Sequence, residues 1–409
     1  MQLRHKLAVD YYGGSFLHFL LKPFVVALGM LLRRDHSLNK CSTVTILKMM
    51  GGGSLVVAYP SLLAMKRSPT VHRLNIVASP AVRPFADILG IFDEVIVIDD
   101  SSPWRLLRDS VRACKHLFRT DAIVDVEVHS RLTTVFCLLT CARNRVGFYT
   151  MESFWRRNLS SHLLFCHIGN GIYHFYDQLA GLFGGTVPRF EDCVRAFRDR
   201  VRPPACEAVG TRIGVAPCCS DLGKERMLHR CEWVEILVER LREEPPEAVL
   251  HFLGGPADRE YIETLIGALQ ARVPGVSVHN HAGETTLSQS VELLGSMDEL
   301  QCIDSGLLHF ARLLGVKTVS YWGPTDPETR IRPFAASSDR TNYHRLPCSP
   351  CVHLAPEAPC RGNNICMRLA VSPGLAASLS APAWLAMPLP PVVEQKSVNR
   401  PIPGQSPVA

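Results

Sequence analysis

The sequence predicts an α/β protein built from two doubly wound, Rossmann-like domains that face each other across a cleft. From residue 43 onward, short apolar, β-branched runs alternate with helix-like segments, which is typical of parallel sheets covered by helices on both faces. The alternation breaks once, at a segment with paired prolines, and then restarts. The length of 409 residues is enough for two such domains and additional segments.

Five segments follow from this pattern. They are an N-terminal apolar helical segment (1–42), a first domain (43–200), a linker (201–211), a second domain (212–371) and a Pro- and Ala-rich tail (372–409). The composition of the tail predicts that it is largely disordered. Ligands of open α/β sheets bind at the carboxyl ends of the strands, so two sheets in tandem predict a cleft that holds two substrates together.

The strand candidates are short and rich in apolar residues. In the first domain they are the runs TVTILKMM, LNIVAS, EVIVID and AIVDVEV, and the Gly-rich turn GGGS follows the first of them. In the second domain they are RIGVAP, AVLHFLGG, VSVHN, ELQCIDS and KTVSYWG.

The N-terminal segment contains the apolar stretch Phe16–Leu32, which is interrupted by His18, Lys22 and Pro23. A membrane-spanning helix needs about 20 apolar residues with few charges, and no convincing signal-peptide cleavage site follows. The stretch therefore favours a helix packed on the domain. An interfacial membrane helix and a true span are the alternatives, and Arg33 and Arg34 would suit anionic lipid head groups.

Composition and charge exclude several classes of protein. The net charge of +6 is mildly basic and suits anionic partners, but no Lys/Arg run is dense enough to predict a nucleic-acid partner. The 15 cysteines are mostly scattered through apolar segments, which is unlike a secreted disulfide scaffold. We therefore expect a reducing compartment, the cytoplasm, with peripheral binding to the inner membrane as an option.

The stretch DSGLLHFARLLGVKTVSYWGPTDP, from Asp304 to Pro327, carries the clearest chemical signal. Asp304 and Ser305 end a strand, Gly306 opens a helix, and His309 falls in its first turn. Free backbone N–H groups and the positive end of the helix dipole favour a negative group there, such as the phosphates of a nucleotide. Asp304 could instead cap the helix, and His309 could be a packed core histidine.

Taken together, these residues resemble the donor-site signature of glycosyltransferase family 9, the heptosyltransferase-like enzymes. The resemblance runs in one register from Val44 to Arg368. It is carried by ILKMMGGGSLVVAYPSLLAMKR, FDEVIVID, NRVGF, YHFYDQLAGL, GVAPCCSDLGKER, FLGGPADRE, HAGETTLSQSVELL and CSPC, besides the stretch above.

The resemblance implies a GT-B fold and inverting transfer of a sugar from a nucleotide-sugar donor such as ADP-heptose to a lipopolysaccharide-like glycolipid. It implies that the second domain holds the donor, with Lys224 or Arg226 neutralising phosphate charge, Gly254 and Gly255 allowing close approach, and Asp258 near the ribose. The other donor-binding residues that it implies are Asp304, Ser305, Gly306, His309, Gly323, Pro324, Thr325 and Asp326. No metal or other cofactor is required in this scheme, because Lys/Arg side chains and helix N–H groups can stabilise a leaving diphosphate.

The sequence departs from the family pattern at the general base. The family has an Asp in its N-terminal Gly loop, and the matching residue here is Ser54, which cannot accept a proton at neutral pH without a partner base. Glu127 and His129, just past a strand end, could act instead; alternatively the acceptor is acidic enough, or the protein is inactive. Ser54 could also simply cap the helix that follows the loop.

Four cysteines near the end of the second domain form a Cys-x2-Cys-x8-Cys-x5-Cys pattern, Cys348, Cys351, Cys360 and Cys366. Four thiols at such spacing can hold a structural zinc, although a reduced or partly disulfide-bonded loop is favoured. The main hypothesis is thus a glycosyltransferase acting on a cell-envelope glycolipid, and the alternative is a catalytically silent relative that binds a nucleotide sugar or a partner. A nicotinamide-dependent oxidoreductase is disfavoured, since MMGGGS lacks the required glycine spacing.

Overall fold

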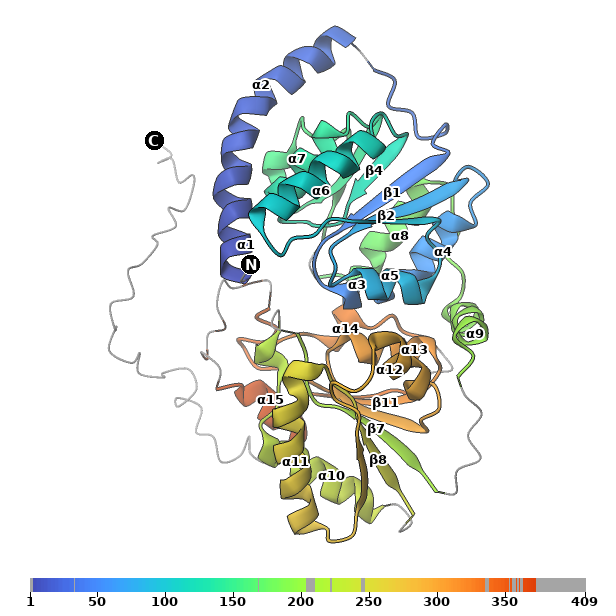
Figure 1. Cartoon of the computed structure of the whole chain (residues 1–409), viewed down its shortest axis with the longest axis vertical. Helices are drawn as coiled ribbons and strands as arrows, with labels where there is room; N and C mark the ends of the chain where they lie inside the picture. Colours follow the sequence, from blue (N-terminus) through green and yellow to red (C-terminus); the bar gives the residue numbers. More distant parts are fainter. Residues whose placement is uncertain are drawn as a thin grey trace, which may run out of the picture.

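The computed structural model describes residues 3–32, 34–167, 169–203, 210–220, 223–243, 247–334, 338–352, 354, 358, 360 and 363–372. The tail predicted for residues 372–409 lies outside these residues from position 373 onward, as do residues 204–209 of the predicted linker. Within the described part, the chain forms two stacked α/β domains and a long N-terminal helix beside the first of them (Figure 1).

Each domain contains one six-stranded parallel sheet. The first has the order β3-β2-β1-β4-β5-β6, and the second has the equivalent order β12-β11-β10-β7-β8-β9. The strand order reverses between β1 and β4 and between β7 and β10, and such switch points are where doubly wound sheets bind ligands. The strands are β1 (Thr43–Lys48), β2 (Arg73–Ala78), β3 (Glu94–Val97), β4 (Ala122–Asp125), β5 (Asn144–Tyr149), β6 (His162–Phe165), β7 (Arg212–Ala216), β8 (Val249–Phe252), β9 (Ser277–Asn280), β10 (Glu299–Ile303), β11 (Lys317–Trp322) and β12 (Arg340–Tyr343).

Helices cover both faces of each sheet, which explains why the central strands are apolar on both sides. The helices before the second sheet are α3 (Gly52–Val57), α4 (Tyr59–Lys66), α5 (Arg83–Leu89), α6 (Pro103–His116), α7 (Arg131–Leu139), η2 (Phe154–Arg156), α8 (Ile172–Leu182) and α9 (Phe190–Val201). Those that follow are η3 (Lys224–Arg226), α10 (Arg230–Arg242), η4 (Pro256–Asp258), α11 (Arg259–Arg272), α12 (Leu287–Leu294), α13 (Gly306–Leu313), α14 (Pro327–Arg330) and α15 (Ile365–Val371).

The two domains touch at the edge of the cleft, where α13 meets α3. Phe310 of α13 stacks on Phe85 and on Phe197, with ring centroids 5.7 and 5.9 Å apart. A side-chain carbon added at Gly53 would lie 3.3 Å from the Cα of Gly306, so glycine at position 53 lets the two helix starts approach closely. The Gly loop of the first domain therefore abuts the helix that opens the donor signature.

The N-terminal helix consists of α1 (Leu3–Ala8), the π-helical turn η1 (Val9–Gly13) and α2 (Gly14–Leu32). Its first part contacts α7, but α2 then runs along the outside of the first domain (Figure 1). The prediction of a helix packed on the domain is therefore confirmed only for the first turns of α2, where Gly14 and His18 are buried, and is wrong for residues 27–32, which are all exposed.

By length and composition, residues His5–Leu32 are long and apolar enough to cross a membrane, and only 6% of the apolar window is buried in the protein. Phe16, Phe19, Phe24 and Leu31 are all exposed on α2. Contiguous exposed apolar side chains of this kind mark a surface that contacts a membrane or another protein.

Candidate functional site

A cavity of about 2200 Å³ lies between the domains, at the carboxyl ends of both sheets. It is lined by the loops after β1 and β4 on the first-domain side and by those after β7, β8, β10 and β11 on the second-domain side. This is the position that the two-domain architecture predicts for two substrates.

On the second-domain side, Asp304 lies at the centre of a buried polar group. Nη1 of Arg226 donates hydrogen bonds of 3.0 Å to Oδ2 and to the carbonyl oxygen of Asp304, and Nε2 of His309 lies 3.7 Å from Oδ1. Burial alone would raise the pKa of Asp304, but the polar contact with His309 and the charge of Arg226 together hold this pKa well below its usual value. Asp304 is therefore ionised and fixes the direction of the Arg226 guanidinium, with the His309 ring beside it.

Two buried hydroxyl groups on the second-domain side of the cavity have no hydrogen-bond partner among the described residues. They are Oγ of Ser305 and Oγ1 of Thr325, and both side chains line the cavity. Ser305, not Asp304, is the N-cap residue of α13, and its side chain bonds no helix amide; the interpretation of Asp304 as a helix cap is thus wrong. Unpaired buried hydroxyls at a helix N-terminus are suited to donate to an anion.

The cations of the donor side have different surroundings. Arg226 forms an ion pair with Asp304. Lys224 lies on the same turn, η3, and lines the cavity. Arg330, at the end of α14, also lines the cavity; its charge acts on Asp304, yet it forms no ion pair with a described residue. Arg330 was not predicted, because it follows the Gly-Pro-Thr-Asp-Pro turn by three residues and belongs to no motif of the sequence.

Several donor-side glycines and acidic residues have local structural roles. Oδ2 of Asp258 accepts a 2.8 Å hydrogen bond from the amide of Gly255 and so holds the turn after β8, and Asp258, Gly254 and Gly255 all line the cavity. Oδ1 of Asp326 accepts from the amide of Glu328 and caps α14.

Only part of the Gly-Pro-Thr-Asp turn faces the cavity. Thr325 and Asp326 line it, but Gly323 and Pro324 do not. A side-chain carbon at Gly323 would lie 2.7 Å from Sγ of Cys366, so this glycine packs against α15. The carbonyl oxygen of Pro324 accepts hydrogen bonds from the amides of Cys351 and Val352. The assignment of Gly323 and Pro324 as cavity-lining residues is corrected accordingly.

On the first-domain side, Glu127 follows β4 and has two different carboxylate oxygens. Oε1 accepts from Nζ of Lys48 at 3.1 Å and from the amides of Met49 and Met50, each at 2.8 Å. Burial alone would lower the pKa of Lys48, but the neighbouring Glu127 raises it, so Lys48 keeps its charge although it is buried. Oε2 makes no hydrogen bond to a described residue, and Glu127 lines the cavity.

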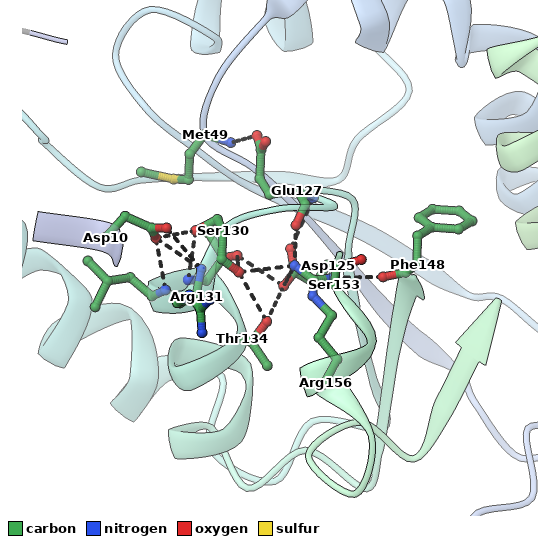
Figure 2. Close-up of polar contacts among 12 residues, drawn as sticks. Asp10, Met49, Asp125, Glu127, Ser130, Arg131, Thr134, Phe148, Ser153 and Arg156 are labelled. Carbon is green, nitrogen blue, oxygen red and sulfur yellow. Dashed lines mark hydrogen bonds and ion pairs between the residues drawn. The ribbon is translucent and has the colours of Figure 1, made fainter. Parts of the chain in front are cut away.

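The loop that carries Glu127 is fixed from both sides, as Figure 2 shows. From below, the fully buried Arg156 bonds the carbonyl oxygens of Glu127 and Ser130 and pairs with Asp125 at 3.1 Å. From the other side, Asp10 of η1 accepts hydrogen bonds from Ser130 and from the first amides of α7. The N-terminal helix is thus attached to the same loop that presents Glu127.

Ser54 and His129, the other first-domain candidates, also line the cavity. Ser54 lies inside α3 and donates its hydroxyl to the carbonyl oxygen of Gly51 at 2.7 Å, while Gly51 is the N-cap. The interpretation of Ser54 as a helix cap is therefore wrong. Partial burial lowers the pKa of His129, which keeps the imidazole neutral and able to accept a proton at pH 7.

Comparison with known proteins identifies the second domain. Residues 213–360 match the model of glycosyltransferase family 9 (heptosyltransferase). By this match, the second domain resembles a family 9 glycosyltransferase. The match begins at β7 and includes Asp304, His309, Thr325 and Arg330, so the family 9 segment contains the whole donor side of the cavity.

Solved structures agree on the GT-B fold. The chain is similar to a family 9 glycosyl transferase from Veillonella parvula (15% identity, 75% of this chain and 87% of that one, TM-score 0.57). It is also similar to Escherichia coli ADP-heptose lipopolysaccharide heptosyltransferase II (16%, 81% and 99%, TM-score 0.57). A third similar structure is E. coli heptosyltransferase WaaC with ADP-2-deoxy-2-fluoro heptose (14%, 82% and 99%, TM-score 0.56). No curated protein sequence matches the chain significantly.

The cysteine cluster of this family 9 domain is not assembled into a metal site by the described residues. Cys348, Cys351, Cys360 and Cys366 are free thiols, and burial raises the pKa of Cys366 to about 12. Among the residues that the structure describes, no group of three or more His, Cys, Asp or Glu side chains is arranged to hold a metal ion.

Proposed function

We propose that the protein is an inverting, metal-independent glycosyltransferase that moves a heptose-like sugar from a nucleotide-sugar donor to a glycolipid of the bacterial cell envelope. The observation that carries this proposal is the pair of unpartnered buried hydroxyls, Ser305 and Thr325, beside the ionised Asp304. Both lie in the segment that matches the family 9 model and line the cavity, Ser305 as the N-cap residue of α13 and Thr325 in the turn after β11. The similar E. coli WaaC structure, which contains ADP-2-deoxy-2-fluoro heptose, supports an ADP-linked heptose as the donor.

In this proposal the donor diphosphate binds at the start of α13. The free amides of the helix and the hydroxyls of Ser305 and Thr325 donate to its oxygens, and Lys224 and Arg330 balance its charge. These groups also stabilise the diphosphate as it leaves, so they can do the work that a bound cation does in other transferases. Asp304 orients His309 and Arg226 toward the sugar end of the donor.

Glu127 is proposed as the general base. Its Oε2 takes the proton of the acceptor hydroxyl, the acceptor oxygen forms the new bond to the anomeric carbon, and the bond to the diphosphate oxygen breaks. The reaction is a single displacement, so the configuration at the anomeric carbon inverts. The hydrogen bonds to Oε1 hold the carboxylate in place during this step. His129, on the same loop, is the second candidate base.

The exposed apolar helix α2 supports a membrane-bound acceptor. We propose that the protein works in the cytoplasm with α2 lying on the inner face of the inner membrane, where Lys22 and Arg34 meet anionic head groups. An enzyme positioned in this way reaches the sugar of a glycolipid without extracting the lipid from the bilayer.

Donor binding is the first test. Purified protein is heated with ADP-heptose and with ADP, UDP, GDP and dTDP sugars, and one nucleotide class is expected to raise its melting temperature by mass action. The Asp304→Ala, His309→Ala variant should lose this response. The anomeric configuration of the product, read by NMR, and activity in excess chelator test inversion and metal independence. A retained configuration, or activity that chelator abolishes, would contradict the proposal.

A catalytically silent relative is the second candidate function, and the residue that favours it is Ser54. The hydroxyl of Ser54 is bonded to Gly51 and lies where the family has its proposed base. Ser54→Asp separates the two functions. Gain of transfer in the variant, with none in the wild type, would support the silent relative; transfer in the wild type would exclude it.

A further inference from the structure

We propose that the cavity has an apolar arm that holds an acyl chain of the glycolipid acceptor, an inference that rests on the proposed function. The arm lies between the N-terminal helix on one side and α6 and α7 on the other, next to the sugar-transfer cleft. It would bind the tail of the acceptor while the head group lies at Glu127.

The walls of the arm are made of large apolar side chains that are only half buried. Six of them are between 41% and 56% exposed although they line the cavity. They are Leu7 of α1, Val9 of η1, Leu107 and Val111 of α6, Phe118 just after α6, and Leu139 of α7. Apolar side chains on facing elements that leave space between them gain free energy when an apolar guest displaces the water.

The charged side chains near the arm are compatible with an uncharged acyl chain, because they are paired or can reach water. Lys6 pairs with Asp100 at 2.5 Å, and Asp10 is bonded to Ser130 and to the first amides of α7 (Figure 2). Lys115, which also lines the cavity, is exposed and can keep its ammonium group in water. The same contacts of Asp10 fix the N-terminal helix at the distance from α7 that leaves the arm open.

Continuity with the transfer site identifies the occupant as part of the acceptor. The arm, Glu127 and the donor-side residues line one cavity, so a single amphiphilic molecule can occupy both parts. Leu17 of α2 lines the cavity as well, while its neighbours Phe16 and Phe19 are exposed on the outside of the helix. The arm therefore ends beside the helix that we propose lies on the membrane, which is where an acyl chain would enter.

The test is a titration of the full-length protein with cis-parinaric acid, a fatty acid whose fluorescence rises in an apolar site. We expect saturable binding at one molecule per chain, displaced by lauric acid. Val111→Glu on α6 and Leu139→Glu on α7 should each weaken binding at least about tenfold, because each inserts a carboxylate into the arm. These side chains are half exposed, so both variants should fold, and unchanged ADP binding would verify this.

Two matched variants separate the arm from other apolar surfaces. The first is Trp104→Glu. Trp104 lies on α6, like Val111, but its side chain is 72% exposed and does not line the cavity. Phe24→Glu lies on the outer part of α2. Both should bind cis-parinaric acid like the wild type.

Equal binding by the wild type and Val111→Glu, or loss of binding in Phe24→Glu, would overturn the inference. Displacement by geranylgeranyl phosphate but not by lauric acid would overturn the assignment to an acyl chain. ADP binding without fatty-acid binding would reject the arm and leave the donor site intact. Fatty-acid binding without nucleotide binding would instead reject the proposed transferase while keeping the apolar site.

Discussion

The two sides of the cavity are built differently. On the second-domain side, Asp304, Arg226 and His309 form one buried group next to unpaired hydroxyls, and the family model matches this domain. On the first-domain side, the residue at the expected base position is Ser54, and the available carboxylate is Glu127, which is held by a different loop. A diphosphate presents the same charge and geometry in every nucleotide sugar, whereas acceptors differ, so the donor side is the more constrained half.

The largest effect is expected at the donor side, from Arg226→Leu. The change leaves the Asp304 carboxylate buried with only His309 beside it, and removing one partner of a buried ion pair costs about 3–5 kcal/mol. Chemical denaturation should show this loss, and calorimetry should show that ADP binding is lost too. The added change Asp304→Asn removes the unpaired charge, so it should restore most of the stability without restoring ADP binding.

Arg259→Leu is the matched control for Arg226→Leu. Arg259 pairs with Glu263 and Glu284 on the surface of the same domain, and surface pairs contribute little to stability. If Arg226→Leu destabilises the protein no more than Arg259→Leu, the buried group does not organise the donor side.

On the acceptor side, Glu127→Gln should lower kcat about 100-fold or more, the usual effect of removing a general base. The amide oxygen of Gln can still accept from Met49 and Met50, so the loop should keep its conformation. ADP affinity should therefore stay unchanged, so that the variant loses turnover but keeps its donor site. If His129→Gln has this phenotype and Glu127→Gln does not, the base is His129.

The sequence predicted most of the fold because the fold depends on local patterns. β-branched runs specify strands, and the order Asp304, Ser305, Gly306 fixes a strand end and a helix start within three residues. Long-range contacts were not predictable in this way. The contact of Asp10 with the amides of α7 joins residues more than 100 positions apart, and the place of Arg330 in the cavity depends on how α14 is positioned in the folded domain.

The same limit explains the errors on the acceptor side and at the N-terminus. Ser54 has the side chain of a good helix cap, but α3 starts two residues before it, so the hydroxyl bonds a carbonyl oxygen. Whether α2 packs on the domain depends on the space left between α6, α7 and the helix. No local pattern in residues 14–32 carries that information.

The attachment of the N-terminal helix should depend on pH through His18. This effect concerns the docking of one helix and not the cavity. Burial and the charge of Arg131 lower the pKa of His18 from 6.5 to about 4, and the ring packs on Trp155. The docked state binds fewer protons than the undocked state, so docking is most stable above about pH 6.5 and loses up to about 3 kcal/mol as pH falls through 4.

The fluorescence of Trp155 can report this undocking. Its contribution is obtained by subtracting the emission of the Trp155→Phe variant from that of the wild type. His18→Phe should remove the pH dependence without destabilising the helix, because Nε2 of His18 is buried and has no hydrogen-bond partner among the described residues. A pH dependence that persists in His18→Phe would assign it to another group, such as Asp10.

The smallest effect on ADP binding is expected from Arg330→Gln on the second-domain side of the cavity. Arg330 lines the cavity and makes no ion pair with a described residue, so its removal should leave the stability of the protein unchanged. If it meets the diphosphate, the Kd for ADP should rise about tenfold, the lower end of the effect of a charged hydrogen bond. The Kd of the variant should also depend less on salt, because one screened attraction is gone.

Arg340→Gln is the control for this prediction. Arg340 is exposed on β12 and lies outside the cavity, so its replacement should change neither the Kd for ADP nor its dependence on salt. Equal ADP affinities of wild type and Arg330→Gln would mean that Ser305, Thr325 and the amides of α13 hold the diphosphate without this cation.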